Sequence, residues 1–97
     1  VFSHPRALRM KIMIVSALWC QSCLYMRKHF KTWMSLHPEI EFVQADLDLD
    51  EKLIDSLGPF KVLPTVLLFR DDQVIDRWVG EHSIEELENL LAHAQTL

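Results

Sequence analysis

The chain has 97 residues, of which 49% are hydrophobic and 25% are charged, as expected of one small globular domain that folds without disulfides or metals. Its formal net charge of −4 and the absence of a Lys/Arg block argue against nucleic-acid binding, which needs clustered cations to contact phosphates. Two cysteines are too few for a disulfide framework or for a zinc site built from cysteines alone, so no metal is expected and a redox use of the pair is favoured.

Residues 1–9 show no clear periodicity, and we interpret them as a leader or an added segment, with Met10 as a candidate native start and one domain covering 10–97. Basic residues before the apolar run Ile12–Leu18 superficially copy a signal peptide, but the run is short, and Trp19 stands where a small residue would be needed. The run is also far too short to cross a bilayer. We therefore predict a cytoplasmic protein without membrane association.

The first half of the chain predicts a strand, a helix and a second strand. Lys11–Ala17 is a continuous, β-branched apolar run, typical of a strand buried on both faces. Cys20–Leu36 has helical periodicity, and Ile40–Leu47 is again strand-like. The buried side of the helix is expected to hold Cys23, Met26, Phe30 and Trp33. A strand, a crossover helix and a strand in this order imply a parallel, right-handed unit.

A short helix is predicted next, from an N-cap at Asp50 to Leu57. Its buried side is expected to hold Leu53 and Ile54 together with Leu57. Gly58 follows, and a glycine at this position suits the left-handed backbone that often ends a helix.

The remainder of the chain predicts a hairpin and a last helix. Thr65–Arg70 and Gln73–Val79 are apolar strands joined by the acidic pair 71–72, which suits a tight turn. Ser83 begins the helix, and Glu86 completes a capping box. The expected fold class is α/β, with one mixed four-stranded sheet, a βαβ unit followed by ββα, and helices on both faces.

The motif Trp19-Cys20-Gln21-Ser22-Cys23 lies where the first strand leads into the first helix. A thiol at a helix N-terminus faces free backbone N–H groups and the positive end of the helix dipole, both of which lower its pKa. The thiolate attacks a disulfide and the thiol does not. We therefore assign Cys20 as the attacking cysteine and Cys23, one turn further along, as the cysteine that releases the substrate.

Two other interpretations of the pair stay open. In the first, the cysteines are an inert buried pair. In the second, they are half of a zinc site that histidines complete. His29 and His37 lie in or near the helix, but no spacing links them to the cysteines, so both are expected to be solvated.

Five short motifs mark the ends of the predicted elements. They are Ala17-x-Trp19-Cys20-x-x-Cys23, Val43-x-Ala45-Asp46-Leu47-Asp48, Leu63-Pro64-Thr65, Asp71-Asp72 and Val79-Gly80. With them, the chain resembles the thioredoxin superfamily over about residues 12–91. The resemblance implies a thioredoxin fold and a thiol–disulfide oxidoreductase that acts on protein substrates through a redox-active Cys20–Cys23 disulfide, with no other cofactor. We expect a monomer whose electron donor is of the thioredoxin-reductase type.

The resemblance also implies substrate-binding residues beside the cysteines. A cis bond between Leu63 and Pro64 would turn the Leu63 backbone toward the cysteines, where its N–H and C=O pair with an extended substrate. Thr65 belongs to the same substrate-binding segment, and Trp19 gives the substrate an apolar contact beside Cys20. The simpler interpretations are an ordinary proline at the start of a strand and a tryptophan packed on the sheet.

The residues around the motif are unusually apolar. Leu18, Leu24 and Tyr25, together with Leu63, are expected to form a rim around the cysteines. Thioredoxins usually place a basic residue where this chain has Leu24. Such a rim suits contact with a protein better than contact with a small charged thiol.

Three departures from the family pattern matter. Residues 1–9 cannot supply the usual extra strand and helix, so the domain resembles a glutaredoxin-sized core. Gln-Ser replaces the usual Gly-Pro between the cysteines. The acid that thioredoxins commonly bury beneath the second cysteine is Ile14 here, and its lysine partner is Gln44. Without that acid, Cys23 must lose its proton to water or to the departing thiolate, so we expect slow release of the substrate.

Two further functions are compatible with the sequence. A glutaredoxin-type reductase fits the length, although the Val-Pro and Gly-Gly signals expected for glutathione binding are absent. A non-catalytic redox-sensing or protein-binding module, whose cysteine pair only switches a contact, fits the missing acid and the apolar rim.

Overall fold

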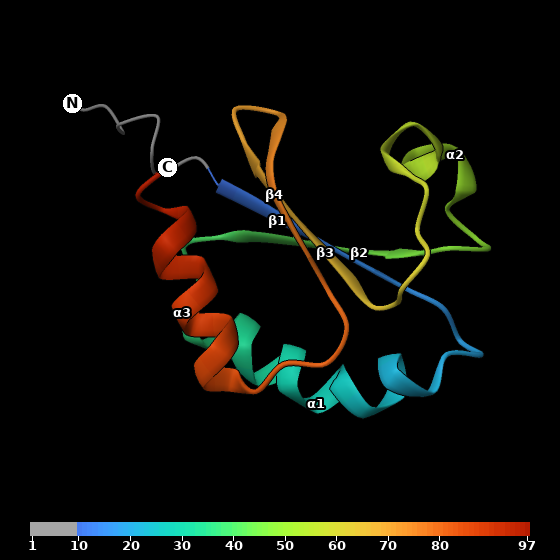
Figure 1. Cartoon of the computed structure of the whole chain (residues 1–97), viewed down its shortest axis with the longest axis horizontal. Coiled ribbons are helices and arrows are strands. Elements are labelled where there is room, and N and C mark those ends of the chain that lie inside the picture. The colour runs from blue at the N-terminus through green and yellow to red at the C-terminus, as the bar shows by residue number, and fades with distance from the viewer. Residues whose placement is uncertain (1–9) are drawn as a thin grey trace.

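The computed structural model describes residues 10–97, so the predicted leader or added segment, 1–9, lies outside the described residues. A four-stranded sheet with strand order β2-β1-β3-β4 forms the centre of the described chain, and helices lie against it (Figure 1). The elements in chain order are β1 (Met10–Ser16), α1 (Gln21–Leu36), β2 (Glu41–Asp46), α2 (Glu51–Ile54), the 3₁₀ turn η2 (Asp55–Leu57), β3 (Thr65–Arg70), β4 (Gln73–Val79) and α3 (Ile84–Ala94). The predicted ends of β1, α1 and β2 differ from these by one residue.

The sheet is mixed, as predicted. β1 pairs in parallel with β2 and antiparallel with β3, and β3 pairs antiparallel with β4. α1 is the crossover between β1 and β2, so the chain runs as a βαβ unit followed by ββα. Val15 near the end of β1 pairs with Thr65 at the start of β3. This pairing brings the cysteine motif after β1 next to the segment that precedes β3.

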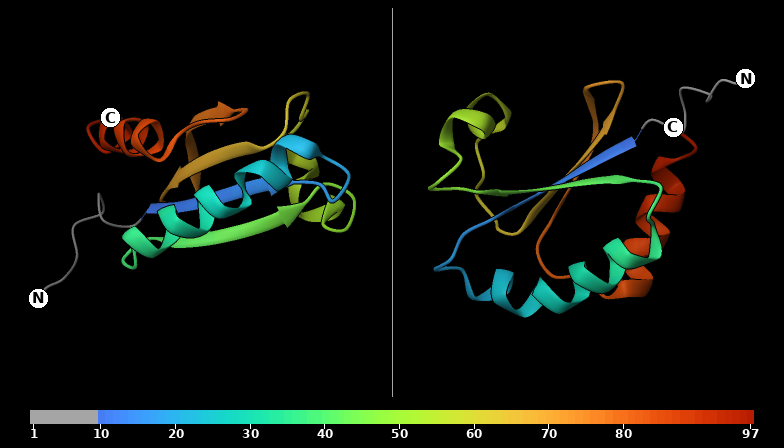
Figure 2. Two further views of the ribbon diagram at one scale, coloured as in Figure 1. Left: turned by 90° about the horizontal axis from the view of Figure 1, so that it is seen from below. Right: turned by 180° about the vertical axis from the view of Figure 1, so that it is seen from behind.

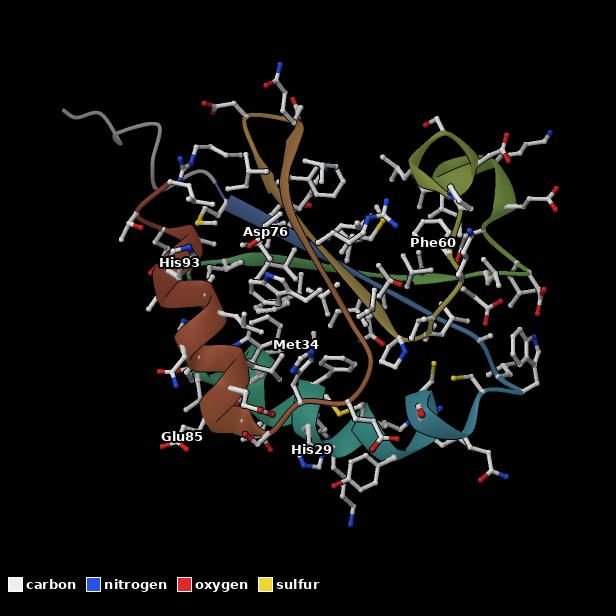
Figure 3. The ribbon with its side chains drawn as sticks, in the orientation of Figure 1. His29, Met34, Phe60, Asp76, Glu85 and His93 are labelled. Atoms are coloured by element: carbon white, nitrogen blue, oxygen red, sulfur yellow. The ribbon has the colours of Figure 1, made fainter. Side chains whose placement is uncertain are left out.

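Alternate residues of β1 enter two separate cores. Ile12 and Ile14 pack on the face that α1 and α3 cover, whereas Met13 and Val15 pack on the face of α2. Figure 2 shows α1 and α3 on one face of the sheet and α2 on the other. Phe60, in the connector after η2, packs on the second face (Figure 3). Because both faces are covered, β1 needs the continuous apolar run that the sequence shows.

The short helix after β2 differs from the prediction. Asp50 holds the N-cap position of α2, but its carboxylate accepts the backbone N–H of Asp46 at 2.7 Å instead of capping the helix. Leu53 is 53% exposed, whereas the next residue, Ile54, is buried. Because successive helical residues point about 100° apart, this single turn cannot bury both side chains against the sheet. Gly58 has φ −79°, so the left-handed backbone expected there is absent. The predicted buried side of this helix is therefore wrong at Leu53.

The tip of the hairpin and the cap of the last helix are confirmed. Asp71 and Asp72 have φ values of 51° and 68°, as a tight two-residue turn between strands requires. Ser83 Oγ accepts the N–H of Glu86 at 3.1 Å, and the Glu86 carboxylate accepts the N–H of Ser83 at 2.8 Å. These two local motifs define where β4 and α3 begin.

The prediction of solvated histidines is wrong. His37, just after α1, is half-buried, and its ring nitrogens contact the carboxylates of Glu88 on α3 and of Glu39. Glu88 also accepts the indole N–H of the buried Trp33 at 3.0 Å. His29 is half-buried as well, and its ring stacks on a neighbouring tyrosine at a centroid distance of 5.1 Å (Figure 3). Sequence spacing could not reveal Glu88, because it lies 51 positions from His37.

The contact of His37 with Glu88 is expected to make stability depend on pH. Burial of the ring alone would lower the pKa of His37, but hydrogen bonds to Glu88 and Glu39 outweigh burial and raise it. A raised folded-state pKa means that the contact stabilises fully below about pH 6.5 and loses its contribution as the pH rises through the folded pKa. We therefore expect His37→Gln to cost about 1–2 kcal/mol of unfolding free energy near pH 5.5 and clearly less near pH 8.5. Urea unfolding at both pH values checks this, with the exposed His93→Gln as the control, and an equal cost at both would contradict it.

Candidate active site

Cys20 is the N-cap residue of α1 rather than its first helical residue. Its backbone is extended, with φ −90° and ψ 118°, and its N–H donates to the Ala17 carbonyl at 3.1 Å. Cys20 Sγ accepts the backbone N–H of Cys23 at 3.2 Å, in the position that a serine or aspartate oxygen often takes at a helix start. An N–H donor is therefore aimed at the sulfur that would carry charge during thiol exchange.

Cys23 lies one turn further along α1 and is buried, with 8% of its surface exposed. Both cysteines are free thiols. Burial is the largest of the causes that raise the pKa of Cys23 to about 12, and the hydrogen bond with Cys20 adds to it, whereas a hydrogen bond with the Ala17 backbone opposes it. The shielded position predicted for Cys23 is confirmed.

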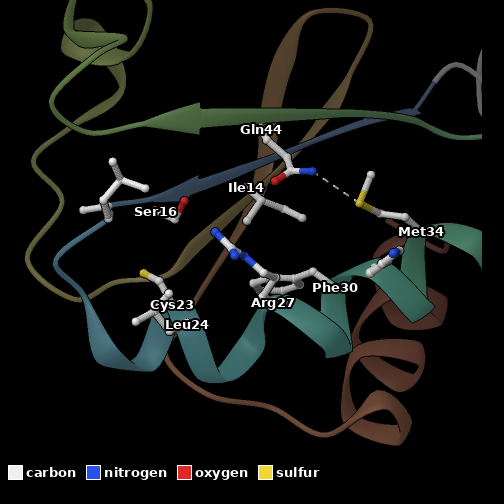
Figure 4. Close-up of a pocket in the computed structure, with 11 residues that line it drawn as sticks. Ile14, Ser16, Cys23, Leu24, Arg27, Phe30, Met34 and Gln44 are labelled. Carbon is white, nitrogen blue, oxygen red and sulfur yellow. Dashed lines mark hydrogen bonds between the residues drawn. The ribbon is translucent and has the colours of Figure 1, made fainter.

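An apolar side chain stands where the family resemblance led us to look for a buried acid. Ile14 is 3% exposed and packs in the core between the sheet and α1. Gln44 is exposed, and its amide contacts a methionine sulfur at 3.9 Å (Figure 4). The charge of Asp46 raises the pKa of Cys23 further, and one Asp46 oxygen already accepts two loop N–H groups at 2.8 and 3.0 Å. Proton loss from Cys23 is thus disfavoured by its surroundings.

The segment before β3 lies against the cysteine motif. The Cys20 thiol donates to the carbonyl oxygen of Leu63 at an Sγ–O distance of 3.8 Å. The Leu63–Pro64 bond is cis, as predicted, and a second cis bond, at Gly58–Pro59, was not anticipated. The Leu63 backbone and the predicted attacking thiol therefore lie side by side.

The Thr65 side chain faces the interior. Its surface is 1% exposed, and its hydroxyl donates to the Val62 carbonyl at 2.7 Å. Its backbone pairs with Val15 on one side and Val79 on the other. Its side chain is thus turned away from the surface, and the membership of Thr65 in the substrate-binding segment stays a prediction. Thr65 instead fixes the position of the preceding segment, in which Pro64 is also buried.

Trp19 is 65% exposed, and its indole N–H donates to the carboxylate of Asp48 at 2.8 Å. This contact was not predicted from the sequence. The signal that could have revealed it is the alternation of Asp46, Asp48 and Asp50, because β2 is parallel to β1 and both strands end at the same edge. The ring is held at the surface by a polar contact and is not packed on the sheet.

The side chains predicted to form the apolar rim are exposed or half-buried. Leu18 and Tyr25 are 69% and 60% exposed, Leu24 is also exposed, and Leu63 is half-buried. With Trp19, they give the segment that contains and follows the cysteine motif several exposed apolar side chains.

A second polar contact joins the motif to the loop after β4. Ser22 Oγ donates to Glu81 Oε2 at 2.8 Å. The two residues are 59 positions apart, so no local pattern in the sequence could have paired them.

A zinc site would need further ligands close to the two cysteines. Among residues 10–97, no group of three or more His, Cys, Asp or Glu side chains is placed to hold a metal ion. Over the same part of the chain, none of the helices combines the length and the apolar character needed to cross a membrane.

Known proteins share both the sequence pattern and the architecture. A family model described as Thioredoxin matches residues 6–93. The chain is 32% identical to the thioredoxin-like protein CXXS1 of Oryza sativa subsp. japonica, over 82% of the chain and 59% of that relative. It is 30% identical to the mitochondrial thioredoxin-2 of Schizosaccharomyces pombe, over 79% of the chain and 56% of that relative. The chain thus spans little more than half the length of these two relatives.

Solved structures show the same fold. Fasciola hepatica thioredoxin has a TM-score of 0.78 and 23% identity, with 91% of this chain and 84% of that chain covered. A chain in the crystal structure of a ferredoxin:thioredoxin reductase and thioredoxin f2 complex has a TM-score of 0.80 and 20% identity, with 93% and 81% covered. Because the family model covers nearly all of the described domain and the sheet and cysteine motif agree with it, the chain belongs to the thioredoxin family.

Proposed function

We propose that this protein is a thiol–disulfide oxidoreductase that exchanges disulfides with protein substrates through Cys20 and Cys23. Membership of the thioredoxin family supports this class of reaction. The observation that carries the proposal is the geometry at Cys20, whose sulfur accepts the Cys23 N–H at 3.2 Å and lies 3.8 Å from the Leu63 carbonyl oxygen. An attacking thiol, a second thiol and a backbone segment for aligning a substrate are thereby gathered at one surface.

In the first half-reaction, the thiolate of Cys20 attacks one sulfur of the substrate disulfide. A bond forms between Cys20 Sγ and that sulfur, the substrate S–S bond breaks, and the other substrate sulfur leaves as a thiolate that takes up a proton. The backbone of Leu63 aligns the substrate segment as an added strand, and the exposed ring of Trp19 provides an apolar contact.

In the second half-reaction, Cys23 loses its proton and attacks Cys20 Sγ. The Cys20–Cys23 bond forms, the mixed disulfide breaks, and the second substrate thiolate leaves, so the substrate gains the two electrons that the cysteine pair gives up. Burial raises the pKa of Cys23 to about 12, and the side chain at position 14 is apolar, so we expect proton loss to limit this step. The proton goes to water or to the departing thiolate.

The apolar rim favours protein disulfides over small charged thiols as substrates. Leu18, Trp19, Leu24 and Tyr25, which flank the two cysteines in the sequence, are all exposed. To return to the dithiol, the oxidised pair needs an external dithiol that supplies two electrons. We propose a partner of the thioredoxin-reductase type, and the similar chain solved in a complex of ferredoxin:thioredoxin reductase and thioredoxin f2 supports this choice.

A redox-sensing module is the second candidate function. The observation that favours it is the buried, high-pKa thiol of Cys23, because slow release would give a mixed disulfide with a partner protein a long lifetime. A long-lived mixed disulfide at Cys20 would act as a redox-controlled contact rather than as a catalytic intermediate.

Reduction of insulin in the presence of a thioredoxin reductase and its nicotinamide donor separates these functions. The proposal predicts that each protein molecule reduces many insulin disulfides, at a rate proportional to protein concentration. Oxidation of the protein once, without further turnover, would contradict the enzyme and favour the sensor. A glutaredoxin-type enzyme would instead turn over with glutathione in place of the reductase.

We further propose that the protein acts as a monomer in the cytoplasm. A monomer leaves the apolar rim open to substrates. The location stays a prediction, because similar proteins include a mitochondrial thioredoxin. Cell fractionation tests the location, and sedimentation of the purified protein tests the monomer.

A further inference from the structure

A cavity of about 400 Å³ opens between α1 and the edge of the sheet formed by β1 and β2 (Figure 4). The buried side chains of Ile14 and Phe30 line it, together with the half-buried Met34. Cys23 borders the same space. A hydrocarbon surface is therefore open to a small molecule directly beside the second cysteine.

Two cations, Arg27 and Lys31, line the same cavity. Arg27 and Lys31 are four residues apart on α1 and lie on one face of the helix. Within residues 10–97, neither has an ion-pair partner, and no Asp or Glu lines the cavity. In Figure 4, the Arg27 side chain extends from α1 toward β1.

The charge of this cavity contrasts with that of the whole chain. The sequence has 14 Asp and Glu against 10 Lys and Arg, yet the charged residues lining the cavity are both positive. Like charges at a four-residue spacing repel each other and mildly disfavour the helix. An anion held near both side chains would relieve that repulsion.

We propose that the cavity binds a small organic anion with an apolar body, such as a medium-chain carboxylate. The carboxylate lies at Arg27 and Lys31, and the hydrocarbon chain covers Ile14, Phe30 and Met34. An isoleucine at position 14 suits this ligand, because an acid there would repel the anion and interrupt the apolar surface. Inorganic phosphate fits less well, since it offers nothing to the apolar lining.

The site does not need the redox activity proposed above in order to bind its ligand. A bound ligand would nevertheless affect that activity. An occupant beside Cys23 excludes water from the thiol and places a negative charge near it, and both effects disfavour a thiolate. The occupied protein should therefore release its substrates more slowly than the empty one.

Titration of the reduced protein with sodium octanoate, followed by NMR, tests the site directly. We expect chemical-shift changes at the Ile14 and Met34 methyl groups, no binding of acetate, and at least about tenfold weaker binding of neutral octanol, because the charged contact is lost. Arg27→Gln and Lys31→Gln should each weaken octanoate binding about tenfold. All of these readouts are independent of disulfide exchange.

The matched control is Lys28→Gln, which removes an exposed cation from the same helix outside the cavity and should change octanoate affinity less than about twofold. Arg27 and Lys31 are exposed, so their variants should fold normally. Unchanged methyl shifts at millimolar octanoate would overturn the proposal. So would equal binding of octanol and octanoate, or equal effects of the Lys28 and Arg27 variants.

Discussion

Replacing Cys23 with serine is expected to convert the protein from a catalyst into a trap for its substrates. Cys20 still attacks, because the donor to its sulfur is the backbone N–H of residue 23, which the substitution keeps. The second thiol is gone, so the mixed disulfide cannot be resolved from within the protein. Insulin turnover should fall to the uncatalysed rate, while nearly one equivalent of mixed disulfide accumulates, as measured by mass spectrometry under non-reducing conditions.

Cys20→Ser is the matched control for this trap. It should lose turnover to the same extent but form no mixed disulfide, because the remaining thiol, Cys23, is buried, with only 8% of its surface exposed. Circular dichroism establishes that both variants keep the fold. Substantial turnover by Cys23→Ser, or an adduct on Cys23 in the Cys20 variant, would contradict the roles assigned to the two cysteines.

Release of the substrate is expected to speed up about tenfold for each pH unit between pH 7 and pH 9. Burial, with the hydrogen bond to Cys20, raises the pKa of Cys23 to about 12, so only a very small fraction of the Cys23 thiol is ionised at pH 7. Burial, the largest cause, persists in the mixed disulfide. Because the thiolate fraction rises tenfold per pH unit below a pKa, loss of the proton to water makes the rate follow pH in this range, whereas direct transfer to the departing thiolate would leave it unchanged. Rapid-quench measurement of mixed-disulfide decay checks this, and a rate that does not change with pH would contradict it.

An acid beneath Cys23 should remove this dependence. Ile14→Asp places a proton acceptor where the chain has an isoleucine that is 3% exposed, so release should become faster at pH 7 and less steep with pH. Burial of the new carboxyl group should cost about 2–4 kcal/mol of unfolding free energy. Ile14→Asn is the matched control, because it destabilises the core similarly but cannot accept the proton. Equal release rates for the two variants would show that the missing acid does not limit the reaction.

The arrangement of the sheet was predictable because short stretches of sequence determine it. The continuous apolar run of β1 requires burial on both faces, and both cores contain its residues. The capping box at Ser83 and Glu86 marks the start of α3 without any tertiary information. The helix after β2 was the exception, because a single turn lacks the length over which periodicity selects a buried face.

The cysteine site was predictable where it, too, depends on a short stretch of sequence. The positions of Cys20 and Cys23 follow from a strand that leads into a helix, which is local in sequence. The contacts of Trp19 with Asp48 and of Ser22 with Glu81 span 29 and 59 positions, so they depend on how loops meet in the folded chain. The exposure of His37 was predicted wrongly for the same reason, since its main partner, Glu88, is on α3.

Peptide mapping of the reduced wild-type protein, after reaction with one equivalent of a protein disulfide, tests the central claim most directly. The account predicts that the protein loses two hydrogen atoms, that the only new cross-link in it joins Cys20 to Cys23, and that the substrate appears as its dithiol. Recovery of both cysteines as free thiols, or of an adduct on Cys23 with Cys20 untouched, would contradict it.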